Sequence, residues 1–225
     1  MLVERLIGPY TGRALTPLAT IDLVGWDIHR AIVDNVYENT KDESHETLRL
    51  PEYMDKLMER GVLGNKTGRG FFMKEGKVRH VLDPVSGGYK PESEFTVPDL
   101  GYIEDVSALH REGRYRDALA IFLGADGHEA ALARKVIAGY ISYAFHRVGE
   151  VTEGIDGIDR IMGTGFNWAP PGVLADVMGA AATVDMIDKA GLPVPAILAD
   201  AARTGEPTRF FDQPHINLGR FFVAG

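Results

Sequence analysis

Residues 16–25 read TPLATIDLVG, and their proline, aspartate and glycine recur at identical spacing in PPGVLADVMG at residues 170–179. Proline is favoured at the first position of an α-helix and glycine just past its end, so each stretch predicts a helix that glycine terminates. Each aspartate is expected to accept hydrogen bonds from the free N–H groups that open the following helix, as an ordinary capping residue does. The matched pairs are Pro17 and Pro171, Asp22 and Asp176, and Gly25 and Gly179.

The match continues downstream of both helices. Residues 51–61 and residues 195–205 each run from a proline to a glycine ten positions later, and Gly61 is the expected left-handed cap of the first helix. We also pair GRGFF at residues 68–72 with GRFF at residues 219–222. Several matches in the same order indicate an internal duplication.

The duplication predicts two domains joined by a linker. Residues 71–98 lose the helical period and predict a small hairpin followed by an irregular segment, so the expected domains are residues 1–98 and 99–225. Residues 8–37 are expected to superpose on residues 163–190, as two repeats packed about a pseudo-twofold axis. Fewer residues precede the first copy than the second, so the first repeat is expected to be truncated at its N-terminus.

Helical periodicity dominates the rest of the chain and predicts an all-α fold. A helix beginning near Asp27 carries Ile28 and Ile32 on one apolar face. Residues 128–148 are apolar on most sides, which predicts a buried helix. Further helices are expected near residues 103–111, 115–123, 171–189 and 195–203.

The stretch GVLGNKTGRGFF at residues 61–72 has the glycines of a phosphate-binding loop without its spelling. A P-loop needs glycine directly before the lysine, where this chain has Asn65, and the dinucleotide pattern needs a third glycine where it has Met73. The glycines are therefore assigned to backbone geometry. At least one residue of the set Gly61, Gly68 and Gly70 is expected to have a positive φ angle.

Composition limits the classes of function. The 225 residues carry a formal net charge of −8 and no run of basic residues, which argues against nucleic-acid binding. There is no cysteine, which fits a reducing, cytoplasmic setting. Residues 136–145 are a candidate membrane segment by their apolar character, but they are too short to span a bilayer and predict a buried helix.

At this point the pattern resembles the C-terminal region of the 3-hydroxyacyl-CoA dehydrogenase family. Three stretches carry the resemblance: GRALTPLATIDLVGWD at residues 12–27, LMERGVLGNKTGRGFF at residues 57–72, and RVGEVTEGIDGIDRIMGTGFNWAPPGVLADVMG at residues 147–179. Together they are similar to two tandem C-terminal helical repeats. The resemblance implies an oxidoreductase of fatty acid β-oxidation that converts a 3-hydroxyacyl-CoA to a 3-oxoacyl-CoA.

The resemblance also implies what this chain does not carry. The family binds NAD on an N-terminal Rossmann domain, which also holds a catalytic histidine and its glutamate partner, and no residue here corresponds to them. No catalytic residue is therefore assigned, and the chain alone is expected neither to bind NAD nor to turn over substrate. Its expected partners are an acyl-CoA substrate and a nucleotide-binding domain, in the same parent chain or in trans. Lys66 and Arg69 are the candidate substrate-binding residues, with a solvated turn as the competing interpretation.

The remaining polar groups give weaker signals. The seven histidines lie outside any matching motif, and no HExxH pattern or other metal-ligand spacing is present, so no metal site is predicted. Two alternative functions remain open. EGRYRDALAIF at residues 112–122 resembles one helix of a tetratricopeptide repeat, which suggests a non-catalytic interaction module, and the chain could also act as a stand-alone acyl-CoA binding protein. Apolar surface left by the truncated repeat favours self-association or association with the nucleotide domain.

Overall fold

A computed structural model describes residues 1–205 and 209–211, and it divides the chain into two compact units. Unit 1 consists of residues 1–5 and 15–98. Unit 2 consists of residues 6–14 and the described residues from 99 onward. The second unit thus includes a segment from the N-terminal part of the chain.

Unit 1 is a set of helices followed by a small sheet. Its helices are α1 (Leu2–Leu6, whose last residue belongs to unit 2), α2 (Pro17–Val24), α3 (Trp26–Asn39) and α4 (Glu52–Glu59), with short 3-10 helices at His45–Thr47 (η2), Asn65–Thr67 (η3) and Glu92–Glu94 (η4). The strands β1 (Phe72–Glu75), β2 (Val78–Leu82) and β3 (Tyr89–Pro91) form an antiparallel sheet in the order β1-β2-β3. Phe72 pairs with Val81, and Leu82 pairs with Tyr89.

The core of unit 1 is centred on Trp26, the first residue of α3, which is fully buried. The rings of Trp26 and Phe71 lie 4.5 Å apart, so the start of α3 packs against the chain segment that leads into β1. Aromatic contacts of this kind contribute about 1 kcal/mol beyond the area that they bury. The other buried members of this cluster are Met54, Leu57, Val62 and Leu82.

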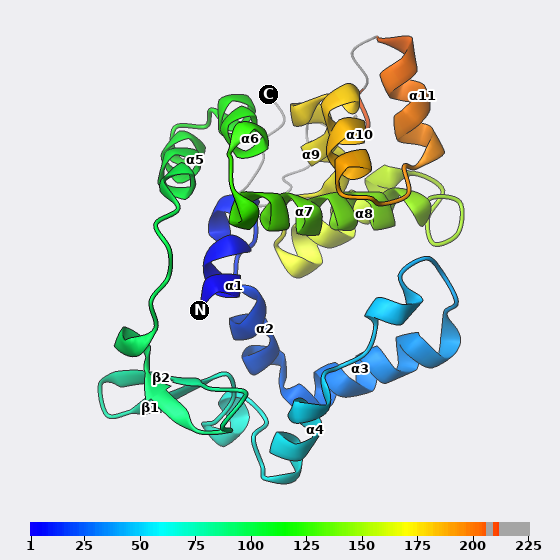
Figure 1. Ribbon diagram of the computed structural model, residues 1–225. Helices are drawn as coiled ribbons and strands as arrows, with labels where there is room; N and C mark the ends of the chain where they lie inside the picture. Colours follow the sequence, from blue (N-terminus) through cyan, green and yellow to red (C-terminus); the bar gives the residue numbers. More distant parts are fainter. Residues whose placement is uncertain (206–208, 212–225) are drawn as a thin grey trace. The chain divides into compact units, whose positions relative to one another are not determined.

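Within its described residues, unit 2 is built mainly of helices. It begins with a 3-10 helix at Pro9–Thr11 (η1) and continues with α5 (Gly101–Arg111), α6 (Tyr115–Gly124), α7 (His128–His146), α8 (Ile155–Arg160), a π-helical turn at Ile161–Phe166 (η5), α9 (Pro171–Met178), α10 (Ala180–Lys189) and α11 (Ala196–Thr204). Figure 1 shows α9 and α10 lying over α7. The segment before α9 also pairs antiparallel with residues 12–14, through the bridge of Arg13 with Trp168.

Helix α7 is buried on more than one side, as its sequence predicts. Its buried residues include alanines that let neighbouring helices approach closely, and larger side chains such as Ile141 and Phe145 fill the space between them. Helices α9 and α10 both pack against α7. None of the described helices is long and apolar enough to cross a membrane.

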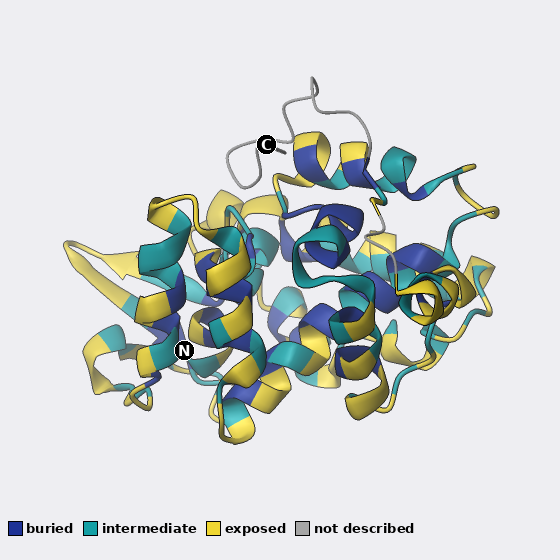
Figure 2. Ribbon diagram, turned by 90° about the horizontal axis from the view of Figure 1, so that it is seen from above, coloured by how far each residue is buried: buried dark blue, intermediate teal, exposed yellow. Residues whose placement is uncertain are grey.

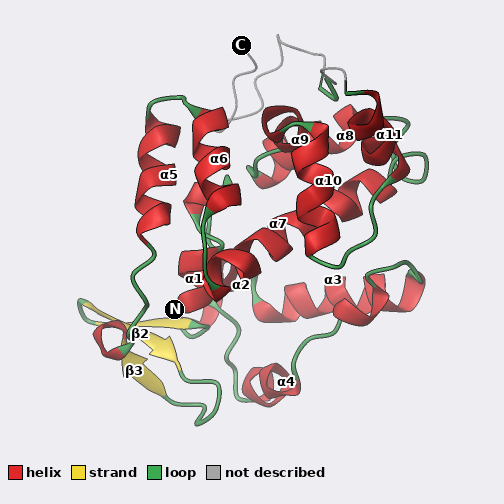
Figure 3. Cartoon of the chain, turned by 45° about the horizontal axis from the view of Figure 1, so that its top comes forward, coloured by secondary structure: helices red, strands yellow, loops and turns green. Residues whose placement is uncertain are grey.

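The predicted fold class is confirmed: the described residues are mostly helical, and strands occur only in the small sheet (Figure 3). A third short strand, β3, extends the expected hairpin because Tyr89 to Pro91 pair with β2. Most helices have both buried and exposed residues (Figure 2). One expected core face is different, since Ile28 and Ile32 are 50% and 54% exposed.

Candidate functional site

Asp22 is the centre of the local structure in unit 1. It lies at the sixth position of α2, and its side chain is 2% exposed. Its Oδ1 accepts hydrogen bonds from the N–H of Phe71 at 2.8 Å and from the indole Nε1 of Trp26 at 2.8 Å, while Oδ2 accepts from the N–H of Phe72 at 2.8 Å. A buried carboxylate is tolerated where several donors satisfy it.

These partners correct the predicted role of the aspartate. Asp22 was expected to cap the N–H groups that open α3, whereas it holds the backbone that enters β1, about fifty residues along the chain. The free backbone groups before a strand need partners as much as those of a helix end do. The carboxylate therefore connects the end of α2 to the start of the sheet.

The glycine-rich turn at residues 64–70 wraps this carboxylate. A Cβ atom on Gly70 would lie 2.1 Å from Oδ1 of Asp22, and one on Gly64, which has a φ angle of 90°, would lie 2.5 Å from the backbone oxygen of Asp22. Only glycine permits such close approaches. Gly61 and Gly68 have φ angles of 78° and 68°, so the expected positive φ angle is confirmed at two positions.

The two candidate substrate-binding residues lie on the exposed side of the same turn. Lys66 forms an ion pair with Asp27, the second residue of α3, and its hydrogen bond lowers the pKa of Asp27. Arg69 is exposed, and it forms no ion pair with any described residue. The turn therefore presents two cations to solvent, and the only carboxylate that pairs with them in the described structure is that of Asp27.

A second acidic residue supports α2 at its beginning. The N–H of Leu18 donates to Oε1 of Glu4 at 2.7 Å, and the hydroxyl of Thr16 donates to Oε2 of Glu4. Carboxylates at a helix N-terminus satisfy free N–H groups and are favoured by the helix dipole. Pro17 follows Thr16 as the first residue of α2, and Gly25 ends the helix with a φ angle of 100°.

Unit 2 contains the same arrangement around Asp176. Its Oδ1 accepts from the N–H of Phe210 at 2.7 Å, and its Oδ2 accepts from the N–H of Phe211 at 3.0 Å. Asp176 is the sixth residue of α9, as Asp22 is the sixth residue of α2, and both helices have proline first. The two aspartates therefore lie in the same local structure, as the duplication predicted.

The rest of the arrangement is also repeated. The N–H of Gly172, the second residue of α9, donates to Oδ1 of Asp159 at 2.8 Å, as Leu18 does to Glu4. Gly179 ends α9 with a φ angle of 86°. The sequence relates Glu4 to Asp159 by their similar distance from the helix that each supports. Glu4 lies 13 residues before Pro17, and Asp159 lies 12 residues before Pro171.

One predicted pairing needs correction. GRFF at residues 219–222 was matched with GRGFF at residues 68–72, but residues 219–222 lie outside the described residues. In unit 2, the backbone N–H groups that donate to the aspartate carboxylate belong to Phe210 and Phe211, which therefore correspond to Phe71 and Phe72. The loop before them is shorter than its counterpart, and Arg209 stands where unit 1 has Gly70. The sequence comparison did not pair Phe210 and Phe211 with Phe71 and Phe72, because unit 2 has no glycine at the position of Gly70.

Asp159 has the most strongly perturbed carboxyl group in unit 2. Its side chain is fully buried, and burial raises its pKa to about 7, although the N–H groups of Gly172 and Val173 favour the charged form. Its Oδ2 has no hydrogen-bond partner among the described residues. Burial also raises the pKa of Asp176, whose two backbone donors oppose the effect. Desolvation thus outweighs hydrogen bonding at both sites.

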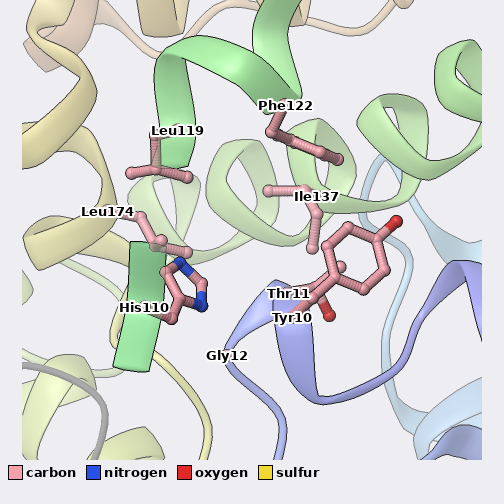
Figure 4. A pocket seen from close by; sticks show the side chains of 8 residues that line it. All are labelled: Tyr10, Thr11, Gly12, His110, Leu119, Phe122, Ile137 and Leu174. Atoms are coloured by element: carbon pink, nitrogen blue, oxygen red, sulfur yellow. The ribbon is translucent and has the colours of Figure 1, made fainter. Parts of the chain in front are cut away.

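A small apolar cavity in unit 2 contains a histidine that the sequence gave no reason to select (Figure 4). The imidazole of His110 points into a space surrounded by apolar side chains, and burial lowers its pKa. Its Nε2 has no hydrogen-bond partner among the described residues. The cavity has room for about one water molecule, so it does not hold a substrate. The lining residues are Tyr10, Thr11, Gly12, Leu119, Phe122, Ile137 and Leu174.

A larger, open groove of about 460 Å³ runs between α7 and α10. Ala131, Arg134 and Lys135 line it from α7, and Ala182 and Met186 line it from α10. The guanidinium of Arg134 donates to the carbonyl oxygen atoms of Phe122 and Ala125, which fixes it to the end of α6. Within the described residues, no three potential metal ligands gather, and His215 lies outside them.

Comparisons with known proteins agree with the sequence pattern. Residues 3–74 match the family model described as 3-hydroxyacyl-CoA dehydrogenase, C-terminal domain. Over 213 residues, or 94% of this chain, the sequence is 26% identical to a protein of Bacillus subtilis (strain 168) named "Probable 3-hydroxyacyl-CoA dehydrogenase". The matched part is 26% of that protein, so the chain spans about a quarter of the length of this relative.

Proposed function

We propose that the chain forms the substrate-side and packing part of a 3-hydroxyacyl-CoA dehydrogenase, whose C-terminal region it resembles. The proposed reaction is the NAD-dependent oxidation of a 3-hydroxyacyl-CoA to a 3-oxoacyl-CoA, a cytoplasmic step of fatty acid β-oxidation. Residues 1–98 and 99–225 are proposed to descend from one duplicated C-terminal domain.

One observation carries this proposal. The family match at residues 3–74 includes Glu4, Asp22, Gly64, Gly70 and the two phenylalanines, which are the residues that build the carboxylate arrangement of unit 1. The matched range therefore includes the residues that determine how α2, the glycine turn and β1 fit together.

The carboxylates of Glu4 and Asp22 accept hydrogen bonds from the backbone and are therefore not assigned to a substrate. The residues proposed to bind a substrate lie on the exposed side of the turn at residues 64–70. Lys66 and Arg69 are exposed there, and an acyl-CoA carries phosphate groups that attract such cations. Arg69 is the better placed of the two, because Lys66 already pairs with Asp27. We assign both a role in substrate binding and no role in the chemistry.

The described residues do not fit a nicotinamide cofactor. Dinucleotide sites use a parallel strand, a glycine-rich turn and a helix N-terminus, whereas the sheet here is antiparallel and the glycine turn encloses Asp22. His110 lies in a small cavity, and among the described residues no hydrogen bond from a carboxylate orients it as a base. We therefore propose that NAD and the catalytic base belong to a separate nucleotide-binding domain.

The test is to mix the purified chain with a nucleotide-binding domain from this family and to follow NADH at 340 nm with a 3-hydroxyacyl-CoA. Turnover by the mixture, with none from either component, supports the proposal, and Arg69→Ala should then raise the KM more than it lowers kcat. Binding of acyl-CoA by the chain without turnover in the mixture supports a stand-alone binding protein. If the chain does not bind acyl-CoA and the mixture shows no turnover, both functions are overturned.

A further inference from the structure

The open groove of unit 2 lies between α10, α7 and the end of α6. Its volume is about 460 Å³, within the range of about 300–1,000 Å³ that is usual for small-molecule sites. Several lining residues are small and leave space that longer side chains would fill: Gly124, Ala131, Ala182 and Ala190. Met186 also lines the groove and is only 4% exposed. The groove therefore offers both room and apolar contact to a small molecule.

The charged side chains that line this groove are mostly cations. Arg134 and Lys135 line it from α7, and Lys189 lines it from α10. Asp185 is the one carboxylate among the described lining residues. Three cations against one carboxylate leave an excess of two positive charges, in a chain whose formal net charge is −8. A local excess of one sign of charge attracts ligands of the opposite sign.

Arg134 is held in place without losing its charge. Its Nη1 donates to the carbonyl oxygen of Phe122 at 3.1 Å and to that of Ala125 at 2.6 Å. A carbonyl group is neutral, so these hydrogen bonds fix the guanidinium while its positive charge stays uncompensated. Within residues 1–205 and 209–211, neither Arg134 nor Lys135 forms an ion pair. Both cations are therefore available to the oxygen atoms of an anion.

Lys189 is the third cation, and it already has a partner. Its Nζ lies 2.7 Å from Oδ2 of Asp185, four residues earlier on α10. The two side chains are 73% and 59% exposed, and ion pairs this exposed contribute little to stability. An anion in the groove can therefore replace the Asp185 carboxylate beside Lys189, and the negative charge of Asp185 opposes its binding.

We propose that the groove is a binding site for a small organic anion with an apolar body, such as an aryl or alkyl sulfonate, carboxylate or phosphate ester. The anionic group lies against Arg134 and Lys135, and the apolar body lies against Met186 and the alanines of α7 and α10. All the lining residues belong to unit 2, whereas Lys66 and Arg69 belong to unit 1. The site is thus made of different residues from those assigned to the substrate, and it does not depend on the proposed function.

The probe is naphthalene-1-sulfonate, and 1-naphthol is its neutral counterpart with the same ring system. Each compound is titrated into the isotopically labelled full chain, and the backbone amide chemical shifts are followed residue by residue. The sulfonate should cause saturable shifts at residues 131–135 and 182–190. It should bind about tenfold more tightly than the naphthol, because only the sulfonate forms charge-assisted contacts.

Three single variants make the test specific. Lys135→Glu should weaken binding of the sulfonate about tenfold, because it places a negative charge at an exposed position beside the anion. Asp185→Asn should strengthen binding about threefold, because it removes the opposing carboxylate and releases Lys189. Lys77→Glu makes the same charge change as Lys135→Glu in the turn between β1 and β2 of unit 1, and it should leave the affinity unchanged.

Equal affinity for the two probes, the absence of saturable shifts at the groove, or an unchanged affinity in Lys135→Glu overturns the proposal. Shifts confined to the turn at residues 64–70 also overturn it, because they assign the anion to Lys66 and Arg69. Saturable shifts at the groove support the site even if the mixture with a nucleotide-binding domain shows no turnover, so this proposal and the proposed function can fail separately.

Discussion

Asp22 and Asp176 do the same work in two units with different surroundings. Each carboxylate follows the proline of its helix by five positions and accepts two backbone N–H groups from a pair of phenylalanines. Asp22 gains a third donor from the indole of Trp26, where unit 2 has Ala180. Unit 1 reaches the carboxylate with a turn that needs Gly70, whereas unit 2 uses a shorter loop with Arg209.

The difference shows which part of the repeat the fold requires. The proline, the aspartate and the two backbone amides are kept, while the turn and the aromatic donor vary. A buried backbone amide must find an acceptor whatever loop delivers it, so the carboxylate is the fixed element. This comparison leads to predictions in which equivalent changes have unequal effects.

The largest effect is expected from Asp22→Ala. It leaves two backbone amides and an indole N–H without an acceptor, and the free energy of unfolding of unit 1 should fall by about 4 kcal/mol. Asp176→Ala removes an acceptor from two amides in a less buried setting, and unit 2 should lose about 2 kcal/mol. Urea titrations with 5-fluorotryptophan separate the units, because Trp26 is in unit 1 and Trp168 is in unit 2.

The matched control is Asp34→Ala, which removes an exposed carboxylate of α3 that pairs with Arg30. It should leave both fluorine signals at the midpoints of the parent chain. Equal losses for Asp22→Ala and Asp34→Ala would contradict the assigned role of Asp22.

The next effect concerns pH and Asp159. Its pKa is about 7 in the folded state, against a usual value near 3.8, because it is buried. The folded state therefore holds the proton more tightly, and the contribution of Asp159 to stability is greatest below about pH 4, falls by about 4 kcal/mol as the pH rises to about 7, and is constant above that. Asp159→Asn should remove this dependence from the Trp168 signal. A parent and variant with parallel pH profiles would show that the carboxyl group is ionised with its usual pKa.

A smaller effect is expected at the glycine turn. Gly70→Ala places a methyl group against the Asp22 carboxylate and should destabilise unit 1 by about 2 kcal/mol. Gly68→Ala meets no atom within 4 Å but has a φ angle of 68°, so about 1 kcal/mol is expected. Gly101→Ala, with open space and no positive φ angle, is the control and should not lower the midpoint of either signal. If Gly70→Ala and Gly68→Ala leave the unfolding midpoint as unchanged as the control does, the geometric account of the turn is contradicted.

The smallest effect on stability is expected from Lys66→Gln. The pair of Lys66 with Asp27 is solvent-exposed, and such pairs contribute little to stability. The unfolding midpoint of the Trp26 signal should therefore be unchanged, at low and at high salt. A clear loss at low salt would show that the ion pair holds the turn against α3.

Sequence predicted the helices and the repeat because proline, aspartate and glycine at fixed spacing have direct local consequences for backbone geometry. It failed where the partner is distant in sequence. The contact of Asp22 with Phe71 and Phe72 depends on tertiary structure, so the aspartate was assigned to the nearest helix opening. Ile28 and Ile32 have the pattern of a buried face, but periodicity does not say whether a covering helix is present. Glu4 and Asp159 were missed because they differ in residue type and are offset by one position.

The central claim is that one arrangement, an aspartate holding two backbone amides, is built twice in this chain. Residue-resolved amide exchange of the unmodified chain tests it most directly at Phe71, Phe72, Phe210 and Phe211. The account predicts that all four amides are protected, that Asp22→Asn accelerates only the first two, and that Asp176→Asn accelerates only the last two. Protection of Phe71 and Phe72 together with unprotected exchange at Phe210 and Phe211 would contradict the claim.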